Sequence, residues 1–328
     1  STYNRVSYTG TKSELYHDVR SKAGKGLGRL TNGNGENLSL VSSNRLYYDF
    51  SVGRHSFNAL GVVEMEKNRS ESGSVVGEGF APGLHVMSTA SRILSAAGDV
   101  FENSFNKGLV QLDYNYNDRY FLTGSYIREY SSRFGANNKA GNFFTLGASW
   151  LLSNEDFFRN TEAITMLKLR ASYGITGNAQ IGNYQALGLY SFATQYAGNS
   201  AAQPYQLANP DLTWEKAKSG NLGVDIAFFK KLMLNLDLYD KTTDGLLLNV
   251  ELPYTSGFRS IIRNVGSIRN RGMEANLTYN LHAGRFTWDA GLNIAFNKSR
   301  VMALDQGKEI RQGNLLISEG KELYVWQM

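Results

Sequence analysis

The chain has 328 residues, of which 42% are hydrophobic, 12% are aromatic and only four are proline. That composition is typical of a folded protein and excludes disorder as the main state. Because cysteine is absent, disulfides, thiolate metal sites and cysteine nucleophiles are excluded as well. The net charge of +5 comes from 34 basic and 29 acidic residues spread along the chain, which argues against a nucleic-acid-binding face.

Period-two alternation of apolar and polar residues begins early in the chain. Predicted strands lie within residues 46–63, 110–126, 144–150 and 167–173, and one face of each strand is free of charge. The positions that alternate with this uncharged face include Asp49, Glu64, Asp113, Lys168 and Arg170. Since successive side chains of a strand point to opposite sides of its sheet, the pattern predicts one apolar and one wet surface.

The alternation is clearest between residues 221 and 297. Two pairs of strands, 221–228 with 232–239 and 273–281 with 286–297, each repeat it on both sides of a short turn. Strands of about 9 to 11 residues are what a tilted chain needs to cross a bilayer core. These strands therefore predict the wall of a membrane barrel.

The links between predicted strands are short at one end of the sheet and long at the other. Short links lie at residues 53–55, 117–119, 229–231 and 282–285, and long ones at 67–106, 129–142, 174–212 and 240–268. Outer-membrane barrels show this asymmetry, with short periplasmic turns and longer external loops. We expect an all-β chain, an antiparallel transmembrane β-barrel with about eleven or twelve strands here.

Motifs for catalysis or metal binding are weak. Gly24, Gly26 and Gly28 lack the spacing of a phosphate-binding loop, and the four histidines, among them His85, do not cluster. We predict no enzyme activity, no metal and no cofactor. One local basic cluster, in a predicted long loop, either forms solvated surface or contacts lipid phosphates or another anionic ligand. It consists of Arg259, Arg263, Arg269 and Arg271.

Several long phrases, in the same order, resemble the SusC/RagA family of TonB-dependent outer-membrane transporters. The resemblance covers residues 37–301. The phrases are YNYNDRYFLTGSY (114–126), SSRFG (131–135), SNEDFF (153–158), LKLRASYGITGNAQIGNY (167–184), NPDLTWEKAKSGNLGVD (209–225), LPYTSGF (252–258) and RNVGSIRNRGMEANL (263–277). One departure is Glu129 and Tyr130, which stand where the family commonly has Asp-Gly before SSRFG.

The resemblance implies a barrel of about 22 strands that is plugged by a separate domain. It also implies a SusD-like surface lipoprotein and TonB as partners, outer-membrane lipid around the wall, and location in the outer membrane of a Gram-negative bacterium. We expect residues 1–328 to be part of the barrel domain, with the plug domain, its TonB box, the signal peptide and the C-terminal strands outside this chain.

Function in such a protein lies in the lumen and the long loops. Candidates for lining the lumen, in contact with plug, water or substrate, are Lys168, Arg170, Asp225, Asp237, Glu274 and Asp289. The first hypothesis is active import of an oligosaccharide or peptide. The alternatives are a passive porin or structural barrel without a plug, and a soluble β-rich adhesin, which strand length and the exclusion of charge disfavour.

Overall fold

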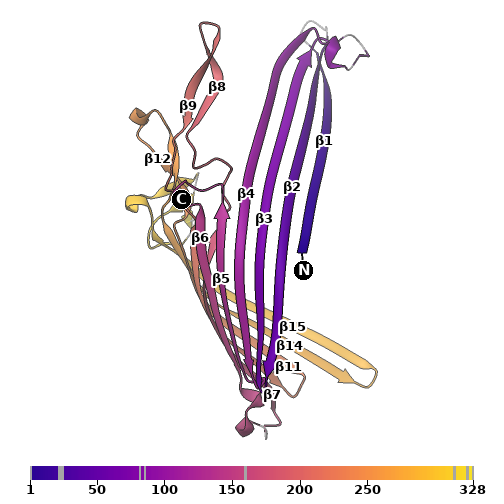
Figure 1. The fold of residues 1–328 in the computed structure, drawn as a ribbon, viewed down its shortest axis with the longest axis vertical. Helices are drawn as coiled ribbons and strands as arrows, with labels where there is room; N and C mark the ends of the chain where they lie inside the picture. The colour runs from indigo at the N-terminus through magenta and orange to yellow at the C-terminus, as the bar shows by residue number, and fades with distance from the viewer. Residues whose placement is uncertain are drawn as a thin grey trace. The chain divides into compact units, whose positions relative to one another are not determined.

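The computed structural model describes residues 2–20, 26–80, 83–84, 86–158, 161–312, 315–322 and 325–326. Within them the main element is a sheet of eleven strands in the order β1, β2, β3, β4, β5, β6, β7, β10, β11, β14 and β15 (Figure 1). The predicted number of strands is confirmed. His85 and Gly24 lie outside the described residues, whereas Gly26 and Gly28 belong to β2.

The chain divides into two compact units, of which the first comprises Ser1–Asn44 and Glu64–Asn106. The strands that contribute to it are β1 (Thr2–Arg20), β2 (Gly26–Val52), β3 (His55–Glu78) and β4 (Arg92–Tyr116). β1 pairs antiparallel with β2 along its whole length.

The expected long loop at residues 67–106 is wrong, because β3 continues to Glu78 and β4 begins at Arg92. A 3-10 turn (Met87–Thr89) lies in the shorter link between them. The parts of β3 and β4 that were expected to be loop carry polar side chains. Arg69, for example, forms ion pairs with Glu71 and Glu102. An apolar alternation disappears where both faces of a strand meet water, although the strand itself goes on.

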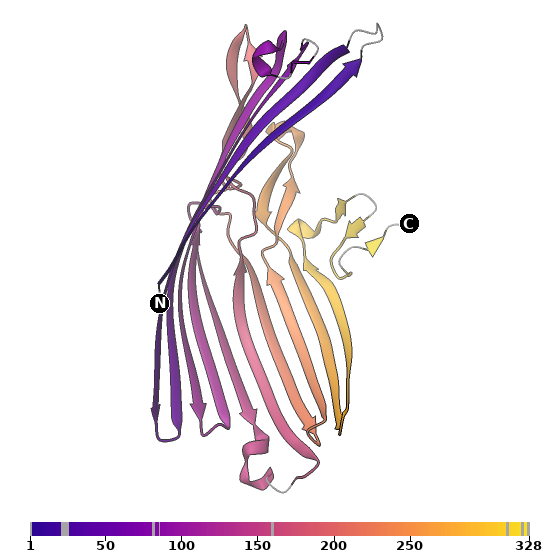
Figure 2. The ribbon, with the colours of Figure 1, turned by 90° about the vertical axis from the view of Figure 1, so that its right-hand side faces the viewer.

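The second unit comprises Arg45–Val63 and Lys107–Met328. Its further sheet strands are β5 (Tyr120–Ser131), β6 (Ala140–Leu151), β7 (Ile164–Asn178), β10 (Glu215–Phe228), β11 (Leu232–Asp244), β14 (Ser267–Ala283) and β15 (Phe286–Ala303). From β5 to β15 every neighbouring pair is antiparallel (Figure 2).

Small hairpins occupy the long connections of the second unit. The link from β7 to β10 holds β8 (Leu189–Tyr196) and β9 (Asn199–Gln206), and the link from β11 to β14 holds β12 (Leu247–Glu251) and β13 (Ser260–Asn264). Three short strands follow β15, namely β16 (Ile310–Gln312), β17 (Leu315–Ile317) and β18 (Val325–Trp326).

The predicted short turns are confirmed at the other end of the sheet. Between β4 and β5, Asn117 and Asp118 adopt φ of 53° and 51°, a left-handed conformation that Asn and Asp tolerate. Between β10 and β11, Phe229 and Lys230 adopt φ of 51° and 57°, which is costlier for such side chains. Tight turns of this kind fix the register of the strands they join.

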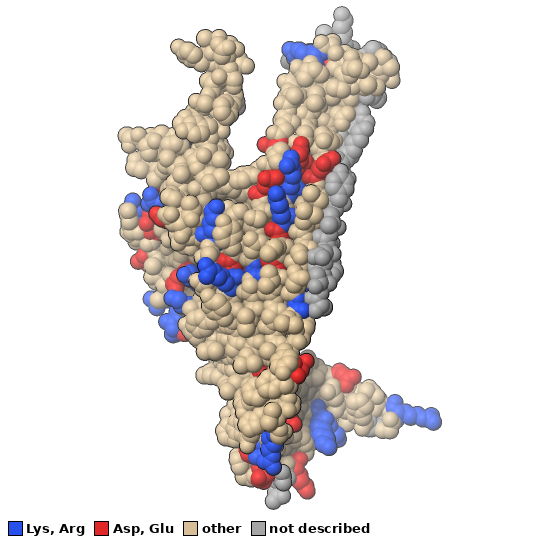
Figure 3. All heavy atoms as spheres, viewed as in Figure 1, with Lys and Arg blue, Asp and Glu red and all other residues tan. Residues whose placement is uncertain are grey.

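Register gives the second unit one apolar face, called the outward face below. Across β6, β7, β10, β11, β14 and β15 one row of paired residues is Ala148, Ala171, Leu222, Leu238, Met273 and Phe296. Leu222 is 62% exposed and Leu238 51%. Figure 3 shows a mostly uncharged zone between charged side chains near the turns and others further up the sheet. An exposed apolar band of this kind is what a bilayer solvates.

Candidate functional site

The opposite face of the same strands, called the inward face, carries a cluster of charges in the middle of the sheet. On β7 the residues Lys168 and Arg170 both alternate with the apolar positions, and β10 pairs with this strand so that Lys168 lies opposite Asp225. Arg170 lies opposite Gly223, which in turn lies opposite Asp237 on β11. Three strands therefore bring these side chains to one place.

The Arg170 guanidinium links two carboxylates. Its Nε and Nη2 donate to the two oxygens of Asp225, each at 2.8 Å, and Nη1 lies 3.0 Å from Oδ1 of Asp237. Asn235 adds a hydrogen bond from Nδ2 to Asp225 at 2.8 Å. Asp225 is 8% exposed, so these bonds replace water that its carboxylate has lost.

Gly223 makes this arrangement possible. A β-carbon at this position would lie 2.7 Å from Cζ of Arg170 and 2.6 Å from Oδ1 of Asp237. The guanidinium therefore passes directly over the glycine to reach the next strand, and any larger side chain would displace it.

The remaining lumen candidates lie on the same face but join the cluster to different degrees. Nζ of Lys168 lies 5.6 Å from the centre of the Phe121 ring, at the distance of a cation–π contact. Glu274 on β14 is the cross-strand partner of Asp237. Asp289 on β15 lies apart, opposite Asn280 near the turn. By register all six residues lie on one face of the sheet, and hydrogen bonds and ion pairs join three of them, Arg170, Asp225 and Asp237, into one cluster.

Two hollows flank Arg170 on this face. One of about 250 Å³ is lined by Phe121, Thr123, Ser149, Gly223 and Asp237 among others, and one of about 450 Å³ by Asn235, Asp237, Glu274, Asn276 and Asn293 among others. Their linings offer both hydrogen-bond donors and acceptors, which suits hydroxyl-rich or amide-rich solutes as well as water.

The four arginines of the predicted basic loop do not form one loop cluster, so that prediction is wrong in its geometry. Arg263 lies in β13 and Arg259 just before it, whereas Arg269 and Arg271 lie in β14. The sequence predicted a loop here because the apolar–polar alternation ends at Arg271, from which the outward residues of β14 are charged and no longer apolar. Arg269 and Arg271 both donate to Asp240 on β11.

Side chains of the long connections pack with Phe143 of β6 into a buried node, called the outer node. Phe134 and Phe143 meet Trp214 with ring centres 4.7 and 5.5 Å apart, and all three side chains are almost fully buried, as is Leu212. A β-carbon on Gly135 would lie 2.1 Å from the backbone oxygen of Pro210, so only glycine fits there.

Asparagines tie the backbone of the outer node together. Asn264 accepts from the Thr213 amide at 2.8 Å and donates to the oxygens of Thr213 and Gly245 at 2.6 and 3.0 Å. Asn209 donates to the oxygen of Ile262 at 2.7 Å. Phe134 and Gly135 belong to the phrase SSRFG, Asn209, Thr213 and Trp214 to NPDLTWEK, and Asn264 to RNVG. The sequence alone did not predict that these phrases contact one another.

At the turn end, Glu155 closes the link from β6 to β7. Its carboxylate accepts from the Tyr120 hydroxyl at 2.7 Å, from Nε1 of Trp150 at 3.0 Å and from Nη1 of Arg119 at 2.8 Å. These donors lower the pKa of Glu155, the Tyr120 hydrogen bond most of all. The sequence phrase SNEDFF contained this residue, but nothing in the phrase marked its partners.

In the described part of the chain, no group of three or more His, Asp or Glu side chains is placed to hold a metal ion. No helix among the same residues is long and apolar enough to span a membrane.

Comparison with known proteins adds the following matches. The model of the family described as TonB dependent receptor-like, beta-barrel matches residues 1–318. A TonB-dependent receptor of Formosa agariphila is 38% identical over 227 residues, which is 69% of this chain and 22% of that protein. A second receptor of that organism is 32% identical over 93% of this chain and 31% of its own length. TonB-dependent receptor SusC of Bacteroides thetaiotaomicron is 32% identical over 61% of this chain and 21% of SusC.

Solved structures agree with these relatives. The RagAB peptide transporter superposes with a TM-score of 0.92 and 25% identity over 99% of this chain and 37% of that chain. The outer membrane transporter YddB of Escherichia coli, at 10% identity and a TM-score of 0.58, shares the fold alone. This chain thus spans between a fifth and a third of the length of the three receptors, 37% of the RagAB chain and 50% of the YddB chain.

Proposed function

We propose that this chain forms part of the barrel wall of a TonB-dependent active importer. The chain belongs to the TonB dependent receptor-like β-barrel family and is of its SusC/RagA type. Proteins of this family lie in the outer membrane of Gram-negative bacteria. The imported solute is an oligosaccharide or a peptide. The observation that carries the proposal is the likeness of 99% of this chain to the RagAB peptide transporter.

The wall needs further strands and a plug to do this work. An open sheet in lipid would leave unpaired backbone groups along β1 and β15, which hydrocarbon does not tolerate. We infer that residues 1–328 are part of a barrel domain of about 22 strands, closed by other strands and filled by a plug domain that TonB engages. A SusD-like surface lipoprotein is the proposed external partner.

In this proposal the inward face contributes no catalytic step. Family members are transporters, and the paired charges around Arg170 give the lumen a wet wall that contacts the plug, water or the passing solute. Lys168, Arg170, Asp225, Asp237, Glu274 and Asp289 remain the candidates for this lining.

Uptake in intact cells tests the energised mechanism. Cells that carry the whole transporter are given a labelled oligosaccharide or a labelled peptide, with TonB present or deleted. We expect uptake of one solute class that is lost without TonB. Uptake that persists without TonB would instead identify a passive porin, and recovery of the purified transporter without a surface lipoprotein would refute the proposed partner.

Two neighbouring substitutions test whether the inward face borders the path. Asn276→Trp projects a large ring into the 450 Å³ hollow, whereas Leu277→Trp places the same ring on the outward face. We expect uptake to fall only in the first variant. Equal uptake in both, at equal amounts of assembled protein, would remove this wall from the solute path.

A further inference from the structure

The hairpin of β8 and β9 lies in a long connection, of the kind that faces outside the cell in such barrels, and it carries no charge. Residues 171–210 contain no Asp, Glu, Lys, Arg or His. The β12–β13 hairpin of the same unit differs, since it contains Glu251 and Arg263. In Figure 3 the protrusion formed by β8 and β9 accordingly shows neither blue nor red atoms. This hairpin therefore offers no partner to a charged solute.

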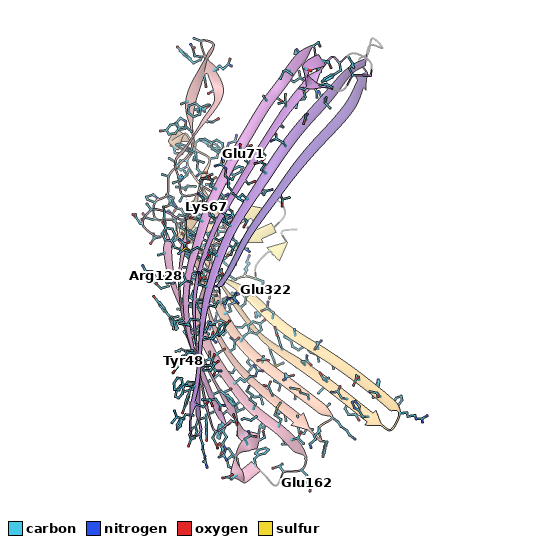
Figure 4. All side chains as sticks on the ribbon, turned by 45° about the vertical axis from the view of Figure 1, so that its right-hand side comes forward. Tyr48, Lys67, Glu71, Arg128, Glu162 and Glu322 are labelled. Carbon is cyan, nitrogen blue, oxygen red and sulfur yellow. The ribbon has the colours of Figure 1, made fainter. Side chains whose placement is uncertain are left out.

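Large aromatic side chains are exposed on this uncharged hairpin. Tyr190 is 64% exposed, Phe192 67%, Tyr205 70% and Tyr196 81%. Figure 4 shows side chains extending outward from the ribbon of the hairpin. Because large apolar groups that are gathered at one exposed place mark interaction sites, the hairpin is a candidate binding surface.

Two of the aromatic rings share one face of the hairpin. Side chains alternate along a strand, so Tyr190 and Phe192 project to the same side of β8, about 6.6 Å apart along the strand. Pro204 is the cross-strand partner of Tyr190, and its ring therefore lies beside the tyrosine on that face. The face thus presents a row of rings whose spacing is comparable with the length of one sugar unit.

Hydrogen bonds fix the base of the hairpin. Nε2 of Gln206 donates to the backbone oxygens of Tyr184 and Leu187 at 2.9 and 2.8 Å. The amide of Asn209, a residue of the outer node, donates to the oxygen of Ala186 at 3.0 Å. The outer node therefore holds the hairpin in place, and a fixed binding element loses less entropy when it takes up a ligand.

Polar groups of the hairpin complement its rings. Gln195, Asn199, Ser200 and Gln203 supply amides and a hydroxyl next to the aromatic residues. These groups both donate and accept hydrogen bonds, as the hydroxyls of a sugar do. The C–H groups on the two faces of a sugar ring pack against aromatic rings, while the hydroxyls at its edge need hydrogen bonds. The hairpin offers both kinds of contact.

We propose that the β8–β9 hairpin is a docking site for an uncharged glycan, whose sugar rings stack on Tyr190 and Phe192 outside the lumen. This inference rests on the proposed import of an oligosaccharide or a peptide, and it selects the oligosaccharide. A peptide is disfavoured because its charged groups would find no partner within residues 171–210. A protein partner is disfavoured because protein interfaces are enriched in arginine as well as in aromatic residues.

Binding to the purified transporter tests the site without reference to uptake. The intact protein in mild detergent is run through native gels that contain amylopectin, laminarin, xyloglucan or galactomannan, which are uncharged, or the anionic polygalacturonate. We expect at least one uncharged polymer to retard the protein and polygalacturonate not to do so. The dependence of mobility on polymer concentration then gives the affinity.

Substitutions locate the effect. The double variant Tyr190→Ala with Phe192→Ala should bind the retarding polymer about tenfold or more weakly, because two stacked rings are lost. The double variant Tyr190→Leu with Phe192→Leu keeps apolar surface without rings and should weaken binding to a similar extent, whereas Phe192→Tyr should bind normally. Tyr254→Ala is the matched control and should keep full affinity, because Tyr254 is 90% exposed on the turn between β12 and β13.

Four results would overturn the proposal: retardation by none of the uncharged polymers, full affinity of the double alanine variant, full affinity of the double leucine variant, or equal loss of affinity in Tyr254→Ala. Loss of a co-purified surface lipoprotein in the double alanine variant, with retardation unchanged, would identify a protein interface instead.

The docking site and the proposed import fail in different ways. TonB-dependent uptake of a peptide by a transporter that no glycan retards would overturn the docking site and leave the energised import intact. Retardation by an uncharged glycan that is lost in the double alanine variant, together with uptake that persists without TonB, would support the docking site and refute the energised import.

Discussion

The outward and inward faces of β7, β10 and β11 are built from the same strands and the same hydrogen bonds, yet different interactions stabilise them. On the outward face, apolar side chains such as Leu222 and Leu238 lie opposite each other, and other apolar side chains could replace them. On the inward face, Arg170 has specific partners at fixed distances and requires a glycine beneath it. The outward face requires only that its residues be apolar, whereas the inward face requires particular residues at particular positions.

The largest expected effect comes from placing an arginine on the outward face, compared with the same substitution at the neighbouring inward position. Leu234→Arg places a cation on the outward face near the bilayer centre, at a cost of about 2–4 kcal/mol. Asn235→Arg places the same side chain on the inward face, beside the carboxylate of Asp225. We expect the first variant of the full transporter to assemble poorly into a heat-modifiable barrel, and the second to assemble normally. Equal behaviour of the two variants would show that the faces are wrongly assigned.

A smaller effect on barrel stability is expected at Gly223, and it should depend on whether Arg170 is present. Gly223→Ala forces the guanidinium away from Asp237 and should destabilise the barrel by roughly 1–3 kcal/mol, measured as a lower temperature of heat modification. In an Arg170→Ala background the same change should cost less, because the guanidinium is gone and the Asp237 carboxylate is no longer held over the glycine by Arg170.

Gly147→Ala serves as the control for this pair. A β-carbon there meets only Thr123, at 3.9 Å, so we expect no measurable change. Additive costs of Gly223→Ala and Arg170→Ala would contradict the proposed crossing.

The smallest effect concerns the turn end, where both faces finish. Because its donors lower the pKa of Glu155, the ionised carboxylate stabilises the fold above its ordinary pKa of 4.5, and this stabilisation is lost as the pH falls through the lowered value. Glu155→Gln should therefore lower the heat-modification temperature well above pH 4.5 and have little effect well below it.

Asp156→Asn should leave the temperature unchanged at either pH. Asp156 contacts the same Arg119 at 3.3 Å, but its side chain is 72% exposed. A pH-independent effect of Glu155→Gln would show that loss of shape, and not of charge, matters at this link.

Sequence alone predicted the outward face well, because a face that needs only a residue class leaves a period-two pattern. It also predicted the positions of the short turns and the common face of Arg170, Asp225 and Asp237. It did not predict that these three touch, since β7 and β10 are joined by the long β8–β9 connection and their relative register is set by pairing. Gly223 gave no signal for the same reason.

Two other features were beyond sequence reasoning. The extension of β3 and β4 was missed because strands wetted on both faces lose apolar periodicity, although their backbone pairing continues. The outer node was missed because its asparagines act on backbone groups far along the chain, as Asn264 does on Thr213. Both residues lie in sequence phrases that resemble the family, but the phrases do not reveal which groups they contact.

The crossing of Arg170 over Gly223 has a consequence for how the wall is assembled. A slip of β7 by one residue against β10 would turn Arg170 toward hydrocarbon and place Leu169 or Ala171 over the glycine. The same slip would leave the Asp225 carboxylate without its guanidinium. Only the observed alignment of the three strands therefore pairs Arg170 with both carboxylates.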